Sequence, residues 1–130
     1  MTRVHGLHHV QLAMPPGGEE DARRFYGEVL GLQEVPKPPD LATRGGCWFR
    51  GDRLELHLGV EEGFRAARKA HPAFVVDELD ALRALLDEVG VETRDDAPLE
   101  GFRRFHGWDP FGNRLEFLEA RTAGRGGREG

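Results

Sequence analysis

Two histidines and two glutamates recur with nearly the same spacing in the two halves of the 130-residue chain. His9 precedes Glu55 by 46 residues, and His71 precedes Glu116 by 45. Neutral imidazole nitrogens and anionic carboxylate oxygens together suit a borderline divalent ion such as manganese, cobalt, nickel, zinc or iron. If the two halves pair about a pseudo-twofold axis, these four side chains converge on it. An ion held in this way keeps open positions for water or substrate.

Each of these residues falls in a segment that reads as a β-strand, where successive side chains point to opposite faces. One face of these strands is polar and carries His9, Gln11 and Ala13, then Glu55, His57 and Gly59, then Glu116 with Leu118. The other face is apolar and carries Val10, Leu12 and Met14, then Leu54, Leu56 and Leu58, then Leu115 and Phe117. The polar set either lines a cavity or forms the solvated face of half-buried sheets, as antiparallel strands often do. The repeated His and Glu spacing favours the cavity.

The elements that would position these residues occur in the same order twice. Apolar residues at helical spacing predict helices over 19–30 and 78–89, with Asp77 as N-cap of the second and a glycine after each. Strand-like segments precede them at 7–14 and 70–76, and short strands follow. Gly51-Asp52 predicts a two-residue hairpin turn between 47–50 and 53–58. Asp109-Pro110-Phe111-Gly112 predicts a type I turn between 102–108 and 113–118. The pattern predicts an α+β fold of two β-α-β-β-β modules, with curled mixed sheets around a central metal-binding cavity and the helices outside.

Length and composition point to one soluble domain. We expect it to cover residues 1–120, with modules at about 5–60 and 68–120, and 121–130 to form a disordered tail. No apolar run approaches the roughly 20 residues needed to span a bilayer, and no secretory signal opens the chain. The net charge of −5 with interleaved basic residues argues against nucleic acid. We therefore expect a cytoplasmic protein with no membrane or nucleic-acid partner, whose single cysteine, Cys47, is a buried and inert thiol.

Short motifs in this order resemble the vicinal oxygen chelate superfamily, which includes glyoxalase I, fosfomycin-resistance thiol transferases, extradiol dioxygenases and bleomycin-resistance proteins. The motifs are LHHVQLA at 7–13, FY at 25–26, VLGL at 29–32 and DPFGNRLE at 109–116. The resemblance extends to about Glu119. It implies that His9, His71 and Glu116 are metal ligands, and that Glu55 is the fourth ligand, as in the glyoxalase I pattern, with His57 as the lesser candidate. An unbound Glu55 would instead serve as a base beside the metal.

The sequence also departs from individual members of the superfamily. Ala13 stands where glyoxalase I carries an arginine for the glutathione carboxylate, which argues against glutathione. Gln11 stands where the fosfomycin enzymes carry a threonine that contacts the substrate, which argues against a phosphonate. Gln11 and His57 remain candidate pocket residues. His106 either lines the cavity or faces solvent, and Arg103 and Arg104 are expected to be solvated.

The resemblance implies a divalent-metal-dependent enzyme that acts on a small oxygen-chelating substrate, with lyase or isomerase chemistry of the glyoxalase kind. One alternative is a thiol transferase of the fosfomycin-resistance kind. Another is a ligand-binding or drug-sequestering protein of the bleomycin-resistance kind, without turnover. Because two modules in one chain can exchange with a second chain, we also expect a homodimer.

Overall fold

The computed structural model describes residues 2–121, and Met1 and residues 122–130 are not described. The predicted tail, 121–130, lies outside the described residues except for Arg121. Among the described residues, no helix is long and apolar enough to cross a membrane. The chain divides into two compact units. Among the described residues, we call 2–66 with Pro110–Asn113 the first unit, and Ala67–Asp109 with 114–121 the second unit.

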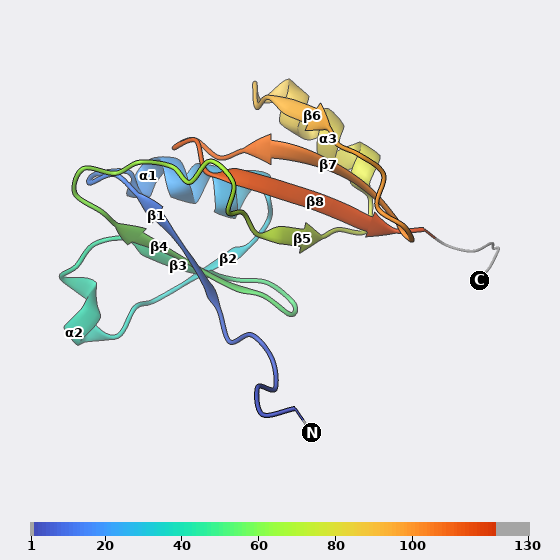
Figure 1. The fold of residues 1–130 in the computed structure, drawn as a ribbon. Helices are drawn as coiled ribbons and strands as arrows, with labels where there is room; N and C mark the ends of the chain where they lie inside the picture. The colour runs from blue at the N-terminus through green and yellow to red at the C-terminus, as the bar shows by residue number, and fades with distance from the viewer. Residues whose placement is uncertain (1, 122–130) are drawn as a thin grey trace. The chain divides into compact units, whose positions relative to one another are not determined.

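The first unit contains a four-stranded mixed sheet in the order β1-β4-β3-β2. β1 and β4 are parallel neighbours, and the other pairs are antiparallel (Figure 1). Its elements in chain order are β1 (Val10–Met14), α1 (Glu19–Ala22), the π-helix η1 (Arg23–Val29), β2 (Gln33–Val35), α2 (Pro39–Ala42), β3 (Cys47–Arg50) and β4 (Glu55–Val60).

The second unit repeats this topology with the order β5-β8-β7-β6, in which β5 and β8 are parallel. Its elements are β5 (Ala73–Val75), α3 (Leu79–Glu88), β6 (Thr93–Asp95), β7 (Phe102–Trp108) and β8 (Arg114–Ala120). The prediction of an α+β fold built from two mixed β-α-β-β-β sheets is confirmed. The central cavity and the single 1–120 domain stay predictions.

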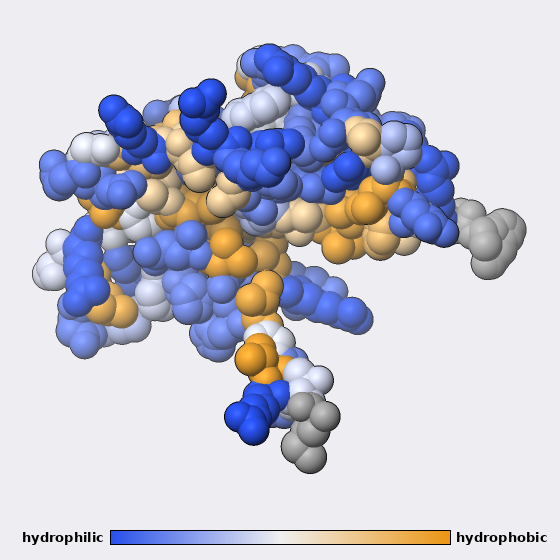
Figure 2. Space-filling view, in the orientation of Figure 1, coloured by the Kyte–Doolittle hydropathy of each residue, from blue (hydrophilic) through white to orange (hydrophobic). Residues whose placement is uncertain are grey.

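Apolar side chains from strands and helices form the core of each unit. In the first unit, buried residues on α1 and η1 pack over the sheet with the inward residues of the strands, namely Ala22, Phe25, Tyr26, Cys47, Phe49, Leu56 and Leu58. In the second unit the buried set is Phe74, Leu79, Leu86, Phe105, Leu115, Phe117 and Leu118. Figure 2 shows hydrophilic residues over α3 and β6, as expected for elements with one face on a core and one in water.

Three local predictions need correction. The first predicted helix is α-helical only to Ala22 and continues as a π-helix, in which the Leu30 amide donates to the Phe25 carbonyl (2.9 Å). The N-cap of α3 is Glu78 rather than Asp77, and the Leu79 amide is satisfied from another element, by the carboxylate of Glu119 (3.4 Å).

The hairpin between β3 and β4 is present, but its turn is one residue later than predicted. The Gly51 amide donates to the Leu54 carbonyl (2.8 Å), so Asp52 and Arg53 occupy the turn. Gly51 serves close packing, since a Cβ there would come within 2.9 Å of Leu32. The turn between β7 and β8 is confirmed, with Gly112 at φ +92°.

Replacing Leu86 with alanine should destabilise the second unit. Leu86 is fully buried on α3, and truncating a buried leucine costs about 2–4 kcal/mol. The neighbouring Leu85 is 37% exposed, so Leu85→Ala should cost less than about 1 kcal/mol and serves as the matched control. Urea denaturation followed by circular dichroism measures both. Equal losses for the two variants would contradict the packing described for α3.

Cys47 should be inert to thiol reagents in the folded protein. Its side chain is buried on β3, and burial raises the pKa of the thiol to about 11. The reactive thiolate is therefore almost absent at pH 8, since the thiol loses its proton only near the raised pKa. Labelling with a chromogenic disulfide at pH 8 should be negligible without denaturant and reach one thiol per chain in urea. Rapid labelling of the native protein would contradict this assignment.

Candidate metal centre

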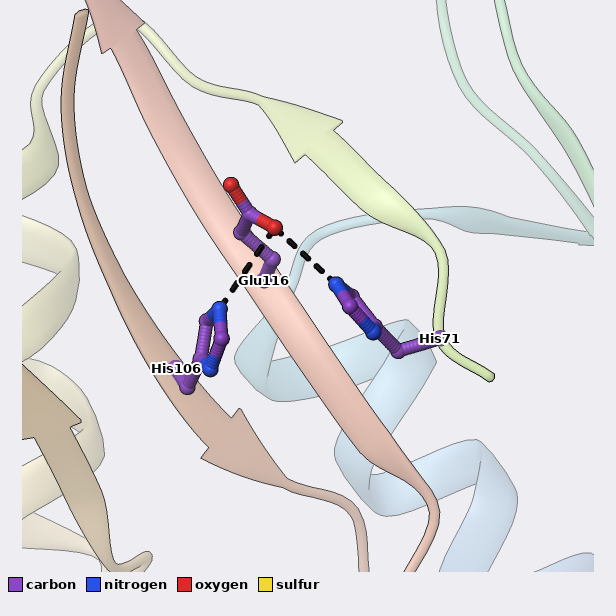
Figure 3. A group of neighbouring side chains, drawn as sticks. All are labelled: His71, His106 and Glu116. Carbon is purple, nitrogen blue, oxygen red and sulfur yellow. Dashed lines mark hydrogen bonds and ion pairs between the residues drawn. The ribbon is translucent and has the colours of Figure 1, made fainter. Parts of the chain in front are cut away.

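Three side chains of the second unit meet at the middle of β8. Single ligand atoms of His71, His106 and Glu116 all lie within 4.8 Å of one another. Glu116 is on β8, His106 is its cross-strand partner on β7, and His71 precedes β5 (Figure 3). The Glu116 amide donates to the Pro72 carbonyl (3.0 Å), which holds the start of β5 against β8. His71 and Glu116, two of the predicted ligands, are thereby brought together.

The hydrogen bonds of His71 show which of its nitrogens can bind an ion. Its Nδ1 lies 2.8 Å from the Lys69 carbonyl oxygen, which only accepts, so Nδ1 carries the proton. In a neutral ring the lone pair is then on Nε2, which faces Glu116 Oε1 at 3.0 Å. Two lone pairs at this distance need a cation between them, either a proton on an imidazolium or a metal ion. A ligand histidine commonly donates its other N–H to a carbonyl in this way.

Glu116 is buried yet ionised. Its Oε2 accepts from Arg104 Nη1 at 3.1 Å, while its Oε1 faces His71. Burial alone would raise its pKa, but the hydrogen bond from Arg104 and the contact with His71 hold the pKa of Glu116 below its ordinary value. Glu116 is therefore an anionic oxygen donor at neutral pH. The expectation that Arg104 is solvated is wrong, because its side chain is 17% exposed and is bound to Glu116 and to the Ala97 carbonyl.

The sequence allows His106 either to line the cavity or to face solvent. In the structure its side chain is buried within this cluster. Its Nδ1 accepts hydrogen bonds from the Arg114 guanidinium, whose Nη2 lies at 2.7 Å and Nε at 3.2 Å. Its Nε2 lies 3.1 Å from Asp96 Oδ2 and 3.4 Å from Glu116 Oε1 but makes no hydrogen bond of good geometry within the described chain. Burial, and then the charge of Arg114, lower the pKa of His106, so its ring is neutral.

A groove of about 260 Å³ on the second unit takes in Asp96 and Arg104. Arg83, which also lines the groove, is paired with Asp95 at 2.6 Å. Arg104 thus lines the groove and also contacts the buried Glu116, and Asp96 lies beside Arg104 in the same groove.

The first unit places its polar residues around a stack of rings. Trp48 stacks on His57 (ring centroids 3.9 Å apart, 3° between planes), and His57 stacks on His9 (4.2 Å, 17°). His57 Nε2 lies 3.0 Å from Glu55 Oε2, and Arg50 Nη2 lies 3.4 Å from Glu55 Oε1. The hydrogen bond with His57 holds the pKa of Glu55 below its ordinary value. Glu55 is therefore ionised, with both oxygens already engaged by side chains.

Gln11 lies on the same face of the first sheet as this stack. It is the parallel-strand partner of His57, and Gly59 leaves room for its amide, since a Cβ at Gly59 would lie 2.8 Å from Gln11 Nε2. The side chain of Gln11 is exposed.

Strand register corrects the apparent equivalence of Glu55 and Glu116. Gln11, two residues after His9, pairs with His57, whereas Ala73, two residues after His71, pairs with Glu116. His57 therefore holds the place in the first sheet that Glu116 holds in the second. The two similar spacings in sequence are not structurally equivalent, because the parallel pairs of the two sheets differ in offset. The predicted ligands lie two in each unit, and their convergence on one ion stays a prediction.

Comparison with solved structures shows which proteins share this fold. A glyoxalase family protein from Bacillus anthracis is 47% identical, with a TM-score of 0.88 over 93% of this chain and 99% of that one. A lactoylglutathione lyase from Agrobacterium tumefaciens is 21% identical, with a TM-score of 0.69 over 91% and 96% of the two chains.

A fosfomycin resistance protein from Listeria monocytogenes, solved as a mutant in complex with Mn(II) and 1S,2S-dihydroxypropylphosphonic acid, is 18% identical. Its TM-score is 0.75 over 94% of this chain and 97% of that one. Neither a scan against models of protein families nor a search of curated proteins gave a match. With nearly half of its residues identical to a glyoxalase family protein over almost the full length of both chains, the protein belongs to the glyoxalase family of the vicinal oxygen chelate superfamily.

Proposed function

We propose that the protein is a divalent-metal-dependent enzyme that performs lyase or isomerase chemistry on a small substrate with two neighbouring oxygen atoms. The observation that carries the proposal is the 3.0 Å approach of His71 Nε2 to Glu116 Oε1, with the Nδ1 proton of His71 directed at a carbonyl. This donor pair fits a divalent ion, because it supplies a neutral nitrogen and an anionic oxygen at the separation of two ligands on one ion. His9 is proposed as the third ligand.

The ion, Glu55 and His57 have different proposed roles in the reaction. When bound, the ion supplies Lewis acidity that polarises two neighbouring substrate oxygens. Glu55, predicted as a fourth ligand or a base, is proposed to act as the base, since His57 and Arg50 hold its carboxylate. It takes a proton from the carbon beside a substrate oxygen. His57, fixed between Trp48 and His9, keeps Glu55 in place.

The residues around the predicted pocket narrow the substrate class. Ala13 brings no cation for a glutathione carboxylate, and Gln11 brings an amide where a threonine would contact a phosphonate. We therefore propose a small oxygenated compound that chelates through carbonyl, hydroxyl or carboxylate oxygens. Manganese, nickel, cobalt, zinc and iron all suit this donor set. The homodimer, the cytoplasmic location and the absence of nucleic-acid and membrane partners stay predictions.

Two alternatives lead to different experimental outcomes. A thiol transferase would consume a thiol together with an epoxide or another electrophile. A sequestering protein would bind its ligand without turnover and would purify without stoichiometric metal. Elemental analysis of gently purified protein separates that last possibility from the two enzymes.

Metal binding should depend on one histidine from the first unit and on a His and Glu pair from the second. Calorimetric titration with zinc should show one ion per chain. His9→Ala, His71→Ala and Glu116→Gln should each weaken binding by roughly 100-fold or more, since loss of a ligand should exceed the 10–100-fold effect of an outer partner. His5→Ala and Glu119→Gln are the matched controls, from the same segment as His9 and the same strand as Glu116. If the controls weaken binding as much as the ligand variants, this assignment is wrong.

Glu55→Gln should separate turnover from binding. The variant keeps the shape of the side chain but loses its basicity, so we expect kcat to fall about 10²–10⁴-fold with little change in zinc affinity or KM. The substrate panel is a hemithioacetal of an α-oxo aldehyde, an epoxide and a catechol, tested with the restored metal. Full activity in Glu55→Gln together with none in His57→Ala would reverse the two roles. No turnover of any panel compound would favour the sequestering protein.

A further inference from the structure

His106 differs from His71 in the partner of its Nδ1 atom. Arg114 approaches that nitrogen with two guanidinium nitrogens, at 2.7 and 3.2 Å. A guanidinium has only N–H donors and stays protonated in proteins, so Nδ1 of His106 must accept. A neutral imidazole with an accepting Nδ1 carries its proton on Nε2. His106 is therefore the Nε2-protonated tautomer.

The two histidines that face Glu116 thus have opposite polarity. His71 donates a hydrogen bond from Nδ1–H to the Lys69 carbonyl and, in a neutral ring, has its lone pair at Nε2. His106 presents an N–H at the same carboxylate oxygen, 3.4 Å away. To bind a metal through Nε2, His106 would have to move its proton to Nδ1, where it would face the N–H groups of Arg114. That arrangement would set donor against donor and lose both contacts.

We infer that His106 is a positioning residue for Glu116, held in its donor tautomer by Arg114, and not a third metal ligand from the second unit. This inference rests on the proposed metal centre. The Nε2 atom is sealed from solvent and lies against two carboxylates, Glu116 Oε1 and Asp96 Oδ2. A small shift would bring its N–H into hydrogen-bond distance of Glu116 Oε1 while the Arg114 hydrogen bonds at Nδ1 are kept.

Arg104 completes the arrangement on the other oxygen of Glu116. Its guanidinium donates to Glu116 Oε2 (3.1 Å) and is itself fixed by the Ala97 carbonyl (2.7 and 3.0 Å). Asp96 lies near His106 (3.1 Å) and Arg104 (3.6 Å), so its negative charge balances a guanidinium beside the site. Glu116 is thus bound by Arg104 at Oε2, while Oε1 faces His71 at 3.0 Å and has the His106 Nε2 atom 3.4 Å away. A carboxylate fixed in this way suits binding of an ion through one oxygen.

The competing assignment makes His71, His106 and Glu116 three ligands of one ion. It is reasonable on distance alone, because the three ligand atoms lie within 4.8 Å of one another. The two assignments differ in the location of one proton. They also differ in whether His106 changes state when metal binds.

Nitrogen NMR of protein labelled with ¹⁵N-histidine observes that proton directly. Long-range proton-nitrogen spectra distinguish the Nε2–H form, the Nδ1–H form and a zinc-bound nitrogen, and His106→Leu assigns the signal. We expect the Nε2–H form for His106 in both the metal-free and the zinc-loaded protein. An Nδ1–H form, or a zinc-bound Nε2, would overturn the inference. If zinc does not bind, the proposed function fails, while the metal-free spectrum still decides the tautomer.

Two further measurements test the roles of Arg114 and His106. Arg114→Met removes the donors to Nδ1 and should convert His106 wholly or partly to the Nδ1–H form, whereas Arg114→Lys, which keeps a donor, should retain Nε2–H. An unchanged tautomer in Arg114→Met would overturn the role of Arg114. His106→Leu should weaken zinc binding about 10-fold, as expected for an outer partner, and clearly less than His71→Ala. A loss equal to that of His71→Ala would identify His106 as a ligand.

Discussion

The approach of His71 Nε2 to Glu116 Oε1 is the contact on which the proposed chemistry depends. The Lys69 carbonyl oxygen accepts a hydrogen bond from Nδ1–H of His71, so the nitrogen that faces the carboxylate has a lone pair whenever the ring is neutral. Such a pair is repulsive unless a cation lies between its atoms. The partial burial of His71 and the burial of Glu116 increase that cost, because water cannot screen the pair fully. The second unit therefore holds two groups arranged for a positive ion.

The strands of the second unit keep this pair together. Glu116 is on a central strand of the sheet, between β5 and β7, and its neighbours in register are the small Ala73 and the ring of His106. Arg104 supplies the charge that keeps Glu116 ionised despite burial. In the first unit, His57 is stacked between Trp48 and His9 and also contacts Glu55. The two halves share a topology but use different interactions to fix their polar side chains.

Alternation along the strands predicted the polar faces that carry Gln11, Glu55 and Glu116, apolar residues at helical spacing predicted the helix positions, and the repeated order of elements predicted the two sheets. Alternation could not predict strand register, because a two-residue change in pairing preserves it. For that reason the similar sequence spacings suggest that Glu55 and Glu116 are equivalent, whereas in the sheets His57 occupies the place of Glu116. The role of His106 could not be predicted from the sequence either. It depends on which ring nitrogen is contacted by Arg114, which lies eight residues further along the β7–β8 hairpin. No sequence pattern specifies a tautomer.

X-ray absorption of the zinc-loaded protein tests the metal centre most directly. We expect a shell of nitrogen and oxygen at about 2.0–2.1 Å, with the outer scattering of two imidazoles. One imidazole should disappear in His71→Ala, and the spectrum of His5→Ala should match that of the unaltered protein. A shell without imidazole scattering, or a spectrum unchanged by His71→Ala, would contradict the account.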